Sequence, residues 1–220
     1  MSLNNYVKEI AEYAEVCYKQ IDAINSVLSG EISKENLRNI AKRHYAEIRT
    51  FLDIKIPERM RLCPPNAYSA KQYFWYLYRE EQGFFKPGEN HAELFLPACY
   101  ALGLSDEELE KEYQAYWPHY KYMFNLTPST DVFIRELAIS TAWESFSPIV
   151  GPHLIKALKK YDIGDDGLKY FTLHYEVDQR HGNQAYKTLS DYVINTDLQS
   201  IAMDAISDSM LKNNYFDFKL

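Results

Sequence analysis

The sequence predicts an all-α fold, with one helical domain spanning residues 1–220. Apolar residues recur at spacings of three and four along almost the whole chain, which is the period of an amphipathic helix. No segment alternates apolar and polar residues with a period of two, so we expect no β-sheet. No repeat of fixed length and no low-complexity linker divides the chain. The simplest architecture is therefore a bundle of about eight to ten helices.

The first half of the chain predicts helices separated by glycine, proline and capping residues. Gly30 ends the first helix, and Ser33 is the expected N-cap of the second. The segment CPPN at 63–66 breaks the chain, because proline removes a backbone donor. Ser105 with Glu108 three residues later forms a predicted capping box. The expected helices are 3–28, 33 to about 51, about 68–82, about 90–102, and one that begins after Ser105.

The second half predicts helices that are more closely spaced. Pro148, Gly151 and Pro152 are expected to interrupt the chain between two of them. The segment DIGDDG then predicts a turn. The expected helices are about 129–146, 153–161, 165–182, 183–194 and 197–213.

Charge and composition exclude several classes of protein. The formal net charge is −7, so we expect no nucleic-acid partner, because phosphate binding needs a basic face. The sequence contains no run of about 18 apolar residues, so we expect no membrane span. The first residues lack an apolar signal core, and Cys17, Cys63 and Cys99 have no paired spacing. These features predict a reduced, cytoplasmic setting.

The stretch LHYEVDQRH at 173–181 carries the strongest functional signal. His174, Asp178 and His181 fall on one face of a helix, because residues three and four apart are neighbours there. Two imidazoles and a carboxylate suit iron, manganese or zinc. Apolar neighbours indicate a largely buried helix, in which an ionised Asp178 needs a cation or a protonated partner. The alternative is that His174, Asp178 and His181 form a solvated polar face. Residues 176, 179 and 180 already form such a face elsewhere on the helix, and a second one would leave it little apolar surface.

Three other places offer further metal ligands. Glu80 and Glu81 both follow apolar helical neighbours, so periodicity does not choose between them. His91 shares a face with apolar residues, and Glu144 ends an apolar stripe. Each signal also has a simpler explanation. The two adjacent glutamates fit a surface pair, His91 fits a hydrogen-bonded core histidine, and Glu144 fits an exposed helix end. Taken together, three carboxylates and three histidines suffice for two metal ions.

Several motifs resemble those of the haem-oxygenase-like dimetal oxidases and oxygenases, a superfamily that includes TenA-type and PqqC-type proteins. The motifs are EEQGF, NHAELF, ALGLSDEELE, AWESFSP and YFTLHYEVDQRH, and the likeness is greatest to CADD-type proteins. The resemblance implies a haem-oxygenase-like helical bundle around a central cavity. It selects Glu80 over Glu81. The ligands that it implies are Glu80, His91, Glu144, His174, Asp178 and His181.

The resemblance also implies a function. Members with this ligand set bind two iron ions, with manganese possible, and activate dioxygen. We therefore expect an oxidase or oxygenase acting on a small metabolite, such as an amino acid or an aromatic compound. No catalytic residue beyond the metal ligands is assigned. A homodimer is a further expectation from the family.

One alternative is the self-sacrificing synthesis of para-aminobenzoate for folate, which the resemblance to CADD-type proteins implies. That chemistry consumes a tyrosine and a lysine ten residues after the glutamate that matches Glu144. Leu154 occupies that position here, and Lys156 follows two residues later. Tyr18 and Tyr45 are loose matches to the tyrosine.

Other members of the superfamily suggest further alternatives. Thiaminase chemistry needs a cysteine in the later half of the bundle, and this chain has none after Cys99. A PqqC-like cofactor-free oxidase and a non-catalytic protein-binding module remain open.

Overall fold

The computed structural model describes residues 3–212, and this part of the chain contains helices and no strand. The expected all-α fold is thus confirmed. The α-helices are α1 (Asn5–Tyr18), α2 (Asp22–Ser29), α3 (Lys34–Thr50), α4 (Ile56–Leu62), α5 (Tyr68–Glu81), α6 (His91–Ala101), α7 (Asp106–Tyr116), α8 (Thr130–Lys159), α9 (Gly164–Ser190) and α10 (Thr196–Ser207). Short π-helical turns, η1 (Phe51–Lys55) and η4 (Asp208–Lys212), and 3₁₀ turns, η2 (Gly83–Phe85) and η3 (Trp117–Asn125), continue or connect them.

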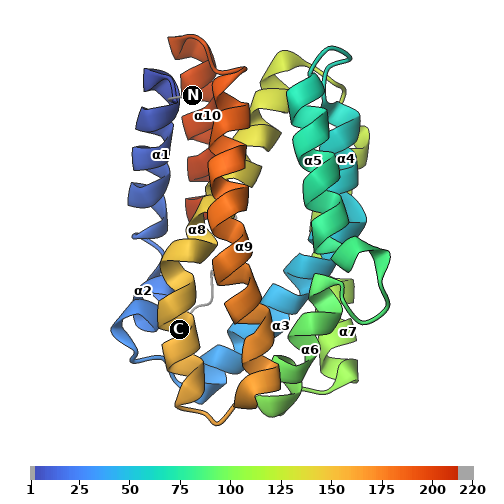
Figure 1. Cartoon of the computed structure of the whole chain (residues 1–220), viewed down its shortest axis with the longest axis vertical. Coiled ribbons are helices and arrows are strands. Elements are labelled where there is room, and N and C mark those ends of the chain that lie inside the picture. Colours follow the sequence, from blue (N-terminus) through green and yellow to red (C-terminus); the bar gives the residue numbers. More distant parts are fainter. Residues whose placement is uncertain (1–2, 213–220) are drawn as a thin grey trace.

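The two longest helices, α8 and α9, form the centre of the bundle. They pack against each other, and α9 runs along the long axis in the middle of the view (Figure 1). On one side α1 and α10 pack together, and on the other α5 and α6 contact α9 (Figure 1). Chemistry-bearing residues of α5, α6, α8 and α9 can therefore meet inside the bundle. Within residues 3–212, no helix combines the length and the apolar character needed to cross a bilayer.

Several expected helix ends agree with the structure. Ser33 Oγ accepts a hydrogen bond from the Asn36 amide, as a helix N-cap does. Ser105 and Glu108 form the capping box that starts α7. Gly30 ends α2 with a φ of 71°, in the left-handed region that glycine adopts without a steric penalty.

Three expected helix boundaries were wrong. The segment 3–28 is broken between Tyr18 and Asp22, where Asn25 Nδ2 donates to the Lys19 carbonyl that the break releases. The helix expected to stop near 146 continues as α8 through Pro148 and Pro152. Proline removes one amide donor, but packing against α9 holds the helix together. The segments 165–182 and 183–194 are largely one helix, α9.

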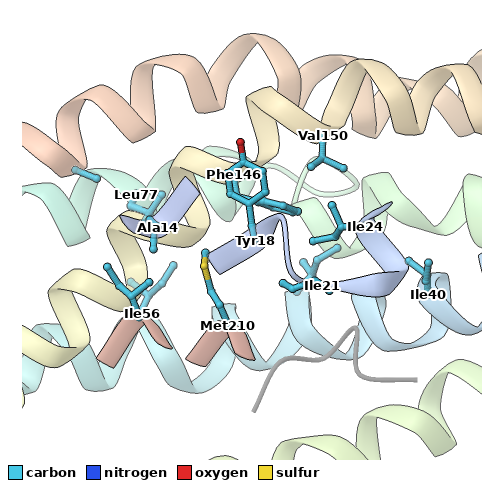
Figure 2. Close-up of a cluster of buried hydrophobic side chains, with 14 of the residues drawn as sticks. Ala14, Tyr18, Ile21, Ile24, Ile40, Ile56, Leu77, Phe146, Val150 and Met210 are labelled. Carbon is cyan, nitrogen blue, oxygen red and sulfur yellow. The ribbon is translucent and has the colours of Figure 1, made fainter. Parts of the chain in front are cut away.

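The core is a connected set of buried apolar side chains from α1 through η4. Figure 2 shows part of it, where Tyr18 of α1 and Ile24 of α2 approach Phe146 and Val150 of α8. Ile21, between α1 and α2, belongs to the same cluster. The Tyr18 and Phe146 rings meet edge to face at a centroid distance of 5.3 Å. This packing holds α8 against α1 and α2.

Gly182 allows α9 to approach α8 closely. A Cβ atom at this position would lie 3.1 Å from Ser145 Cα and 3.3 Å from the carbonyl oxygen of Glu144. Those distances are tighter than ordinary van der Waals contact, so only glycine fits without a shift. Because His181 precedes Gly182, the close approach brings its imidazole to Glu144.

Candidate metal centre

A first group of potential ligands joins three helices. Glu81 ends α5, His91 lies in the first turn of α6, and His174 lies on α9. Their nearest ligand atoms all lie within 4.8 Å of one another. Glu81 Oε2 is 2.5 Å from His91 Nδ1, and the His91 and His174 rings are 4.2 Å apart between centroids. Glu81 and His91 are buried, so this group lies inside the bundle.

A second group joins α8 and α9. Glu144, Asp178 and His181 also place one ligand atom each within 4.8 Å of the others. His181 Nδ1 lies 3.3 Å from Asp178 Oδ1 and 3.4 Å from Glu144 Oε2. The helical spacing of Asp178 and His181 puts them on one face, as the sequence predicts. All three side chains are at least nine-tenths buried.

The structure places the two adjacent glutamates in different surroundings. The resemblance selected Glu80, but Glu81 lies with His91 and His174, and it is 5% exposed. Glu81 continues the buried stripe of α5 that includes Phe74 and Leu77, at spacings of three and four. Glu80 is turned about 100° around the helix from Glu81. Its carboxylate therefore lies beside Nε2 of His181 and not in the first group. Nδ1 of the same ring faces Glu144 and Asp178.

Local structure between α5 and α6 brings His91 to Glu81. Gly83 has a φ of 58°, and a Cβ atom there would lie 2.2 Å from the carbonyl oxygen of Glu89. The turn therefore requires glycine. Asn90 caps α6 by accepting from the Glu93 amide, and Glu93 in turn accepts from the Gly88 amide. These contacts hold the loop so that α6 begins at His91.

Hydrogen bonds on α9 fix which nitrogen of His174 faces the first group. Its Nδ1 lies 3.0 Å from the Tyr170 carbonyl oxygen, which can only accept. Nδ1 therefore carries the proton, and the Nε2 lone pair is free to bind a cation.

Unpaired buried atoms show that the two groups fit metal ions. His91 Nδ1, Asp178 Oδ1 and His181 Nδ1 are buried and have no hydrogen-bond partner among the described residues. The close contact between His91 Nδ1 and Glu81 thus lacks hydrogen-bond geometry. Buried polar atoms normally have partners, so converging acceptors of this kind are suited to a shared cation.

The charges of the two groups lead to the same inference. Burial, with nearby carboxylates, raises the pKa of Glu81 and of Glu144 to about 7. Burial lowers the pKa of His91 to about 4. Burial also opposes a charge on His181, but contacts with Asp178 and Glu144 prevail and raise its pKa to about 11. A proton on His181 thus offsets part of the negative charge of Asp178 and Glu144, and a metal ion would offset more of it.

A cavity of about 630 Å³ adjoins both groups. Glu81 and His174 of the first group, and Glu144 and Asp178 of the second, line it. This volume suits a small organic ligand. Most of the remaining wall is apolar, and it includes Ile24, Val27, Leu37, Phe95, Phe146 and Leu158.

Sequence reasoning missed the ionic residues at another part of this wall. Lys55 lies 2.6 and 2.7 Å from the two carboxylate oxygens of Glu47, and Arg59 Nε lies 3.2 Å from Glu136 Oε2. Lys55 and Arg59 are both buried. Their spacing of four within an apolar stretch was the available signal.

The fold and the buried donors place the chain in the class of helical bundles with a candidate metal centre between facing helices. The chain belongs to a family of iron-containing redox enzymes, whose model matches residues 43–210. The expected resemblance to the haem-oxygenase-like superfamily is thereby confirmed.

Two curated relatives carry the name 4-aminobenzoate synthase. The protein from Chlamydia muridarum is 30% identical over 158 residues, which cover 70% of this chain and 64% of the relative. The protein from Chlamydia trachomatis is 27% identical over 175 residues, which cover 78% and 73%. The match to the first thus spans slightly less than two thirds of that relative. These relatives support the likeness to CADD-type proteins.

A solved structure shows the same fold. The crystal structure of a TenA homologue from Pseudomonas syringae matches with a TM-score of 0.72. The match covers 98% of this chain and 90% of that chain, at 13% sequence identity. The three cysteines of this chain are buried, and none of them lines the cavity. The chain therefore has the fold of the TenA homologue but no cysteine at its candidate site.

Proposed function

We propose that this protein is a dinuclear non-haem iron enzyme that uses dioxygen to oxidise a small molecule held in the cavity. The supporting observation is the pair of buried three-residue groups, which together offer three carboxylates and three imidazoles beside that cavity. Membership of an iron-containing redox family supports iron as the metal. The same donors accept manganese.

Each group of side chains would hold one metal ion. Glu81, His91 and His174 would hold the first ion, and the second would lie among Glu144, Asp178 and His181. Iron held there would supply the electrons with which dioxygen is reduced.

The protein's own residues orient the ligands and shape the substrate site. The Tyr170 carbonyl fixes the His174 tautomer, and Glu80 fixes that of His181. The apolar cavity wall excludes water from the reacting part of the substrate. A group of the substrate that lies beside Glu144 and Asp178 would adjoin the ligands of the second site.

Metal binding and oxygen consumption test this proposal together. We expect about two iron ions per chain after anaerobic loading, followed by dioxygen uptake. The double variant His174→Ala/Asp178→Ala should lose both properties, because it removes one ligand from each group. His153→Ala is the matched control, since His153 is exposed on α8. Turnover that persists in the presence of a chelator would instead support a cofactor-free oxidase.

A second candidate function is the synthesis of 4-aminobenzoate, which the names of the two relatives favour. In that reaction the chain would supply its own side chains. Lys156 is exposed, and Tyr18 and Tyr45 do not line the cavity, so these earlier candidates lie outside the described wall. The tyrosines and the lysine that do line it are Tyr116, Tyr120, Tyr122, Tyr170 and Lys55.

Mass spectrometry separates the two candidates. If the chain is a self-sacrificing synthase, one exposure of the iron-loaded protein to dioxygen should change the mass of a tyrosine-containing peptide and release 4-aminobenzoate. If the enzyme oxidises an external substrate, the chain mass should stay constant over many turnovers.

A further inference from the structure

The Arg59 side chain is buried in the cavity wall, and most of its donors are unused. Arg59 is 4% exposed and lines the cavity. Among the described residues, its side chain makes one hydrogen bond, from Nε to Glu136 Oε2. A guanidinium carries five N–H donors, so both terminal amino groups remain for a ligand.

The neighbouring cation, Lys55, is not available in the same way. Both oxygens of Glu47 accept from its ammonium group, and its Nζ also lies 3.8 Å from the centre of the Tyr120 ring. Tyr116 Oη donates to the same Glu47 carboxylate. This network is satisfied internally. Lys55 therefore adds a second positive charge near Arg59, but its ammonium group is already bound to Glu47 and does not compete for a ligand.

Stability does not explain the buried Arg59–Glu136 pair. Moving two charges out of water costs about as much as their attraction returns, and well-packed apolar residues often replace such pairs without loss. A guanidinium that lines a cavity with free amino groups is, however, well suited to bind a carboxylate through two parallel hydrogen bonds.

A polar stripe on α8 connects this charged end to the metal centre. Glu136, Ser140, Glu144 and Ser147 follow at spacings of four, four and three, and all line the cavity. Ser140 Oγ is buried beside the Tyr73 hydroxyl. Glu136 and Glu144 are separated by about 12 Å along the helix axis, from a rise of about 1.5 Å per residue.

We propose that Arg59 anchors the carboxylate of a small monocarboxylic acid, whose apolar body extends along α8 to the metal centre. The inference rests on the proposed function, because it assigns the substrate class of the same cavity. The apolar wall contacts the body of the acid, and Ser140 offers a polar contact midway. The part of the acid farthest from its carboxylate then lies beside Glu144.

Binding of octanoate to the metal-free protein tests the anchor. Its neutral and cationic counterparts, 1-octanol and octylamine, have the same chain without the carboxylate. Trp143 lines the cavity, so its fluorescence reports occupancy, and calorimetry gives the dissociation constant. We expect octanoate to bind at least about tenfold more tightly than either analogue, because charge-assisted hydrogen bonds are the strong ones.

The decisive variant is the double substitution Arg59→Gln/Glu136→Gln. Arg59→Gln alone would leave Glu136 buried without its partner, which endangers folding. The double variant keeps shape and charge balance. It should weaken octanoate binding at least about tenfold and leave 1-octanol binding unchanged. Arg61→Gln is the control, since Arg61 does not line the cavity.

Two results would overturn the inference: equal octanoate affinity in the double variant and the unaltered protein, or equal affinity for octanoate and its uncharged analogue. Neither result bears on metal binding. Failure of the two-iron proposal appears separately, as a wrong metal content in a protein that still binds octanoate.

Discussion

Glu80 Oε2 lies 2.5 Å from His181 Nε2, on the side of the imidazole ring opposite the second ligand group. Arg180 holds the same carboxylate through two hydrogen bonds of 2.9 and 3.2 Å. Burial opposes ionisation of Glu80, but His181 and Arg180 prevail and lower its pKa. An ionised carboxylate can only accept, so Nε2 carries a proton and Nδ1 faces Asp178 and Glu144.

We therefore predict that Glu80→Gln weakens metal binding at the second group about tenfold, because contacts of this type typically change metal affinity by about 10–100-fold. Titration with Co²⁺, followed by its absorption bands, measures the two sites in sequence. Glu89→Gln is the control, since Glu89 pairs with Lys86 in the exposed loop. A purely structural role for Glu80 would instead lower the melting temperature of the metal-free protein and leave the Co²⁺ affinity unchanged.

Metal affinity should fall as the pH is lowered from about 8 to 6. Burial raises the pKa values of Glu81 and Glu144 to about 7, so both carboxyls of the metal-free protein become protonated over this range. A metal ion must displace these protons, and each proton released changes the apparent affinity by up to about tenfold per pH unit. Competition with a chelator of known affinity gives the constants. An affinity that is constant between pH 6 and 8 would contradict the assignment of these two carboxylates as ligands.

Gly182 and Gly151 provide a matched pair at the α8–α9 contact. Gly182→Ala would push a Cβ to 3.1 Å from Ser145 Cα, so we predict a loss of about 1–3 kcal/mol in unfolding free energy and weaker metal binding at the second group. Gly151→Ala meets only ordinary contacts, at 3.7 Å from Tyr175, and should stabilise α8 by up to about 1 kcal/mol. Urea unfolding of the metal-free proteins measures both changes. Equal effects of the two substitutions would refute the close-approach explanation.

The sequence was informative where spacing alone decides the geometry. His174, Asp178 and His181 lie on one helix, so their common face followed from a period of 3.6 residues. The choice between Glu80 and Glu81 was beyond this reasoning, because each has apolar neighbours three and four residues away. Only the packing of α5 against α9 separates them.

Contacts between distant segments could not be predicted from periodicity. The continuation of α8 through Pro148 depends on its packing against α9, which no local signal reports. The pairing of Arg59 with Glu136 joins residues 77 positions apart. Such long-range pairs depend on the tertiary arrangement of α4 and α8, so a single sequence does not specify them.

Anaerobic Fe²⁺ titration of the unaltered protein and of Glu81→Ala tests the central claim most directly. We predict about two iron ions per chain for the unaltered protein and about one for the variant, since the second group keeps all three of its ligands. Retention of two ions by Glu81→Ala, or binding of no more than one by the unaltered protein, would contradict the two-site centre.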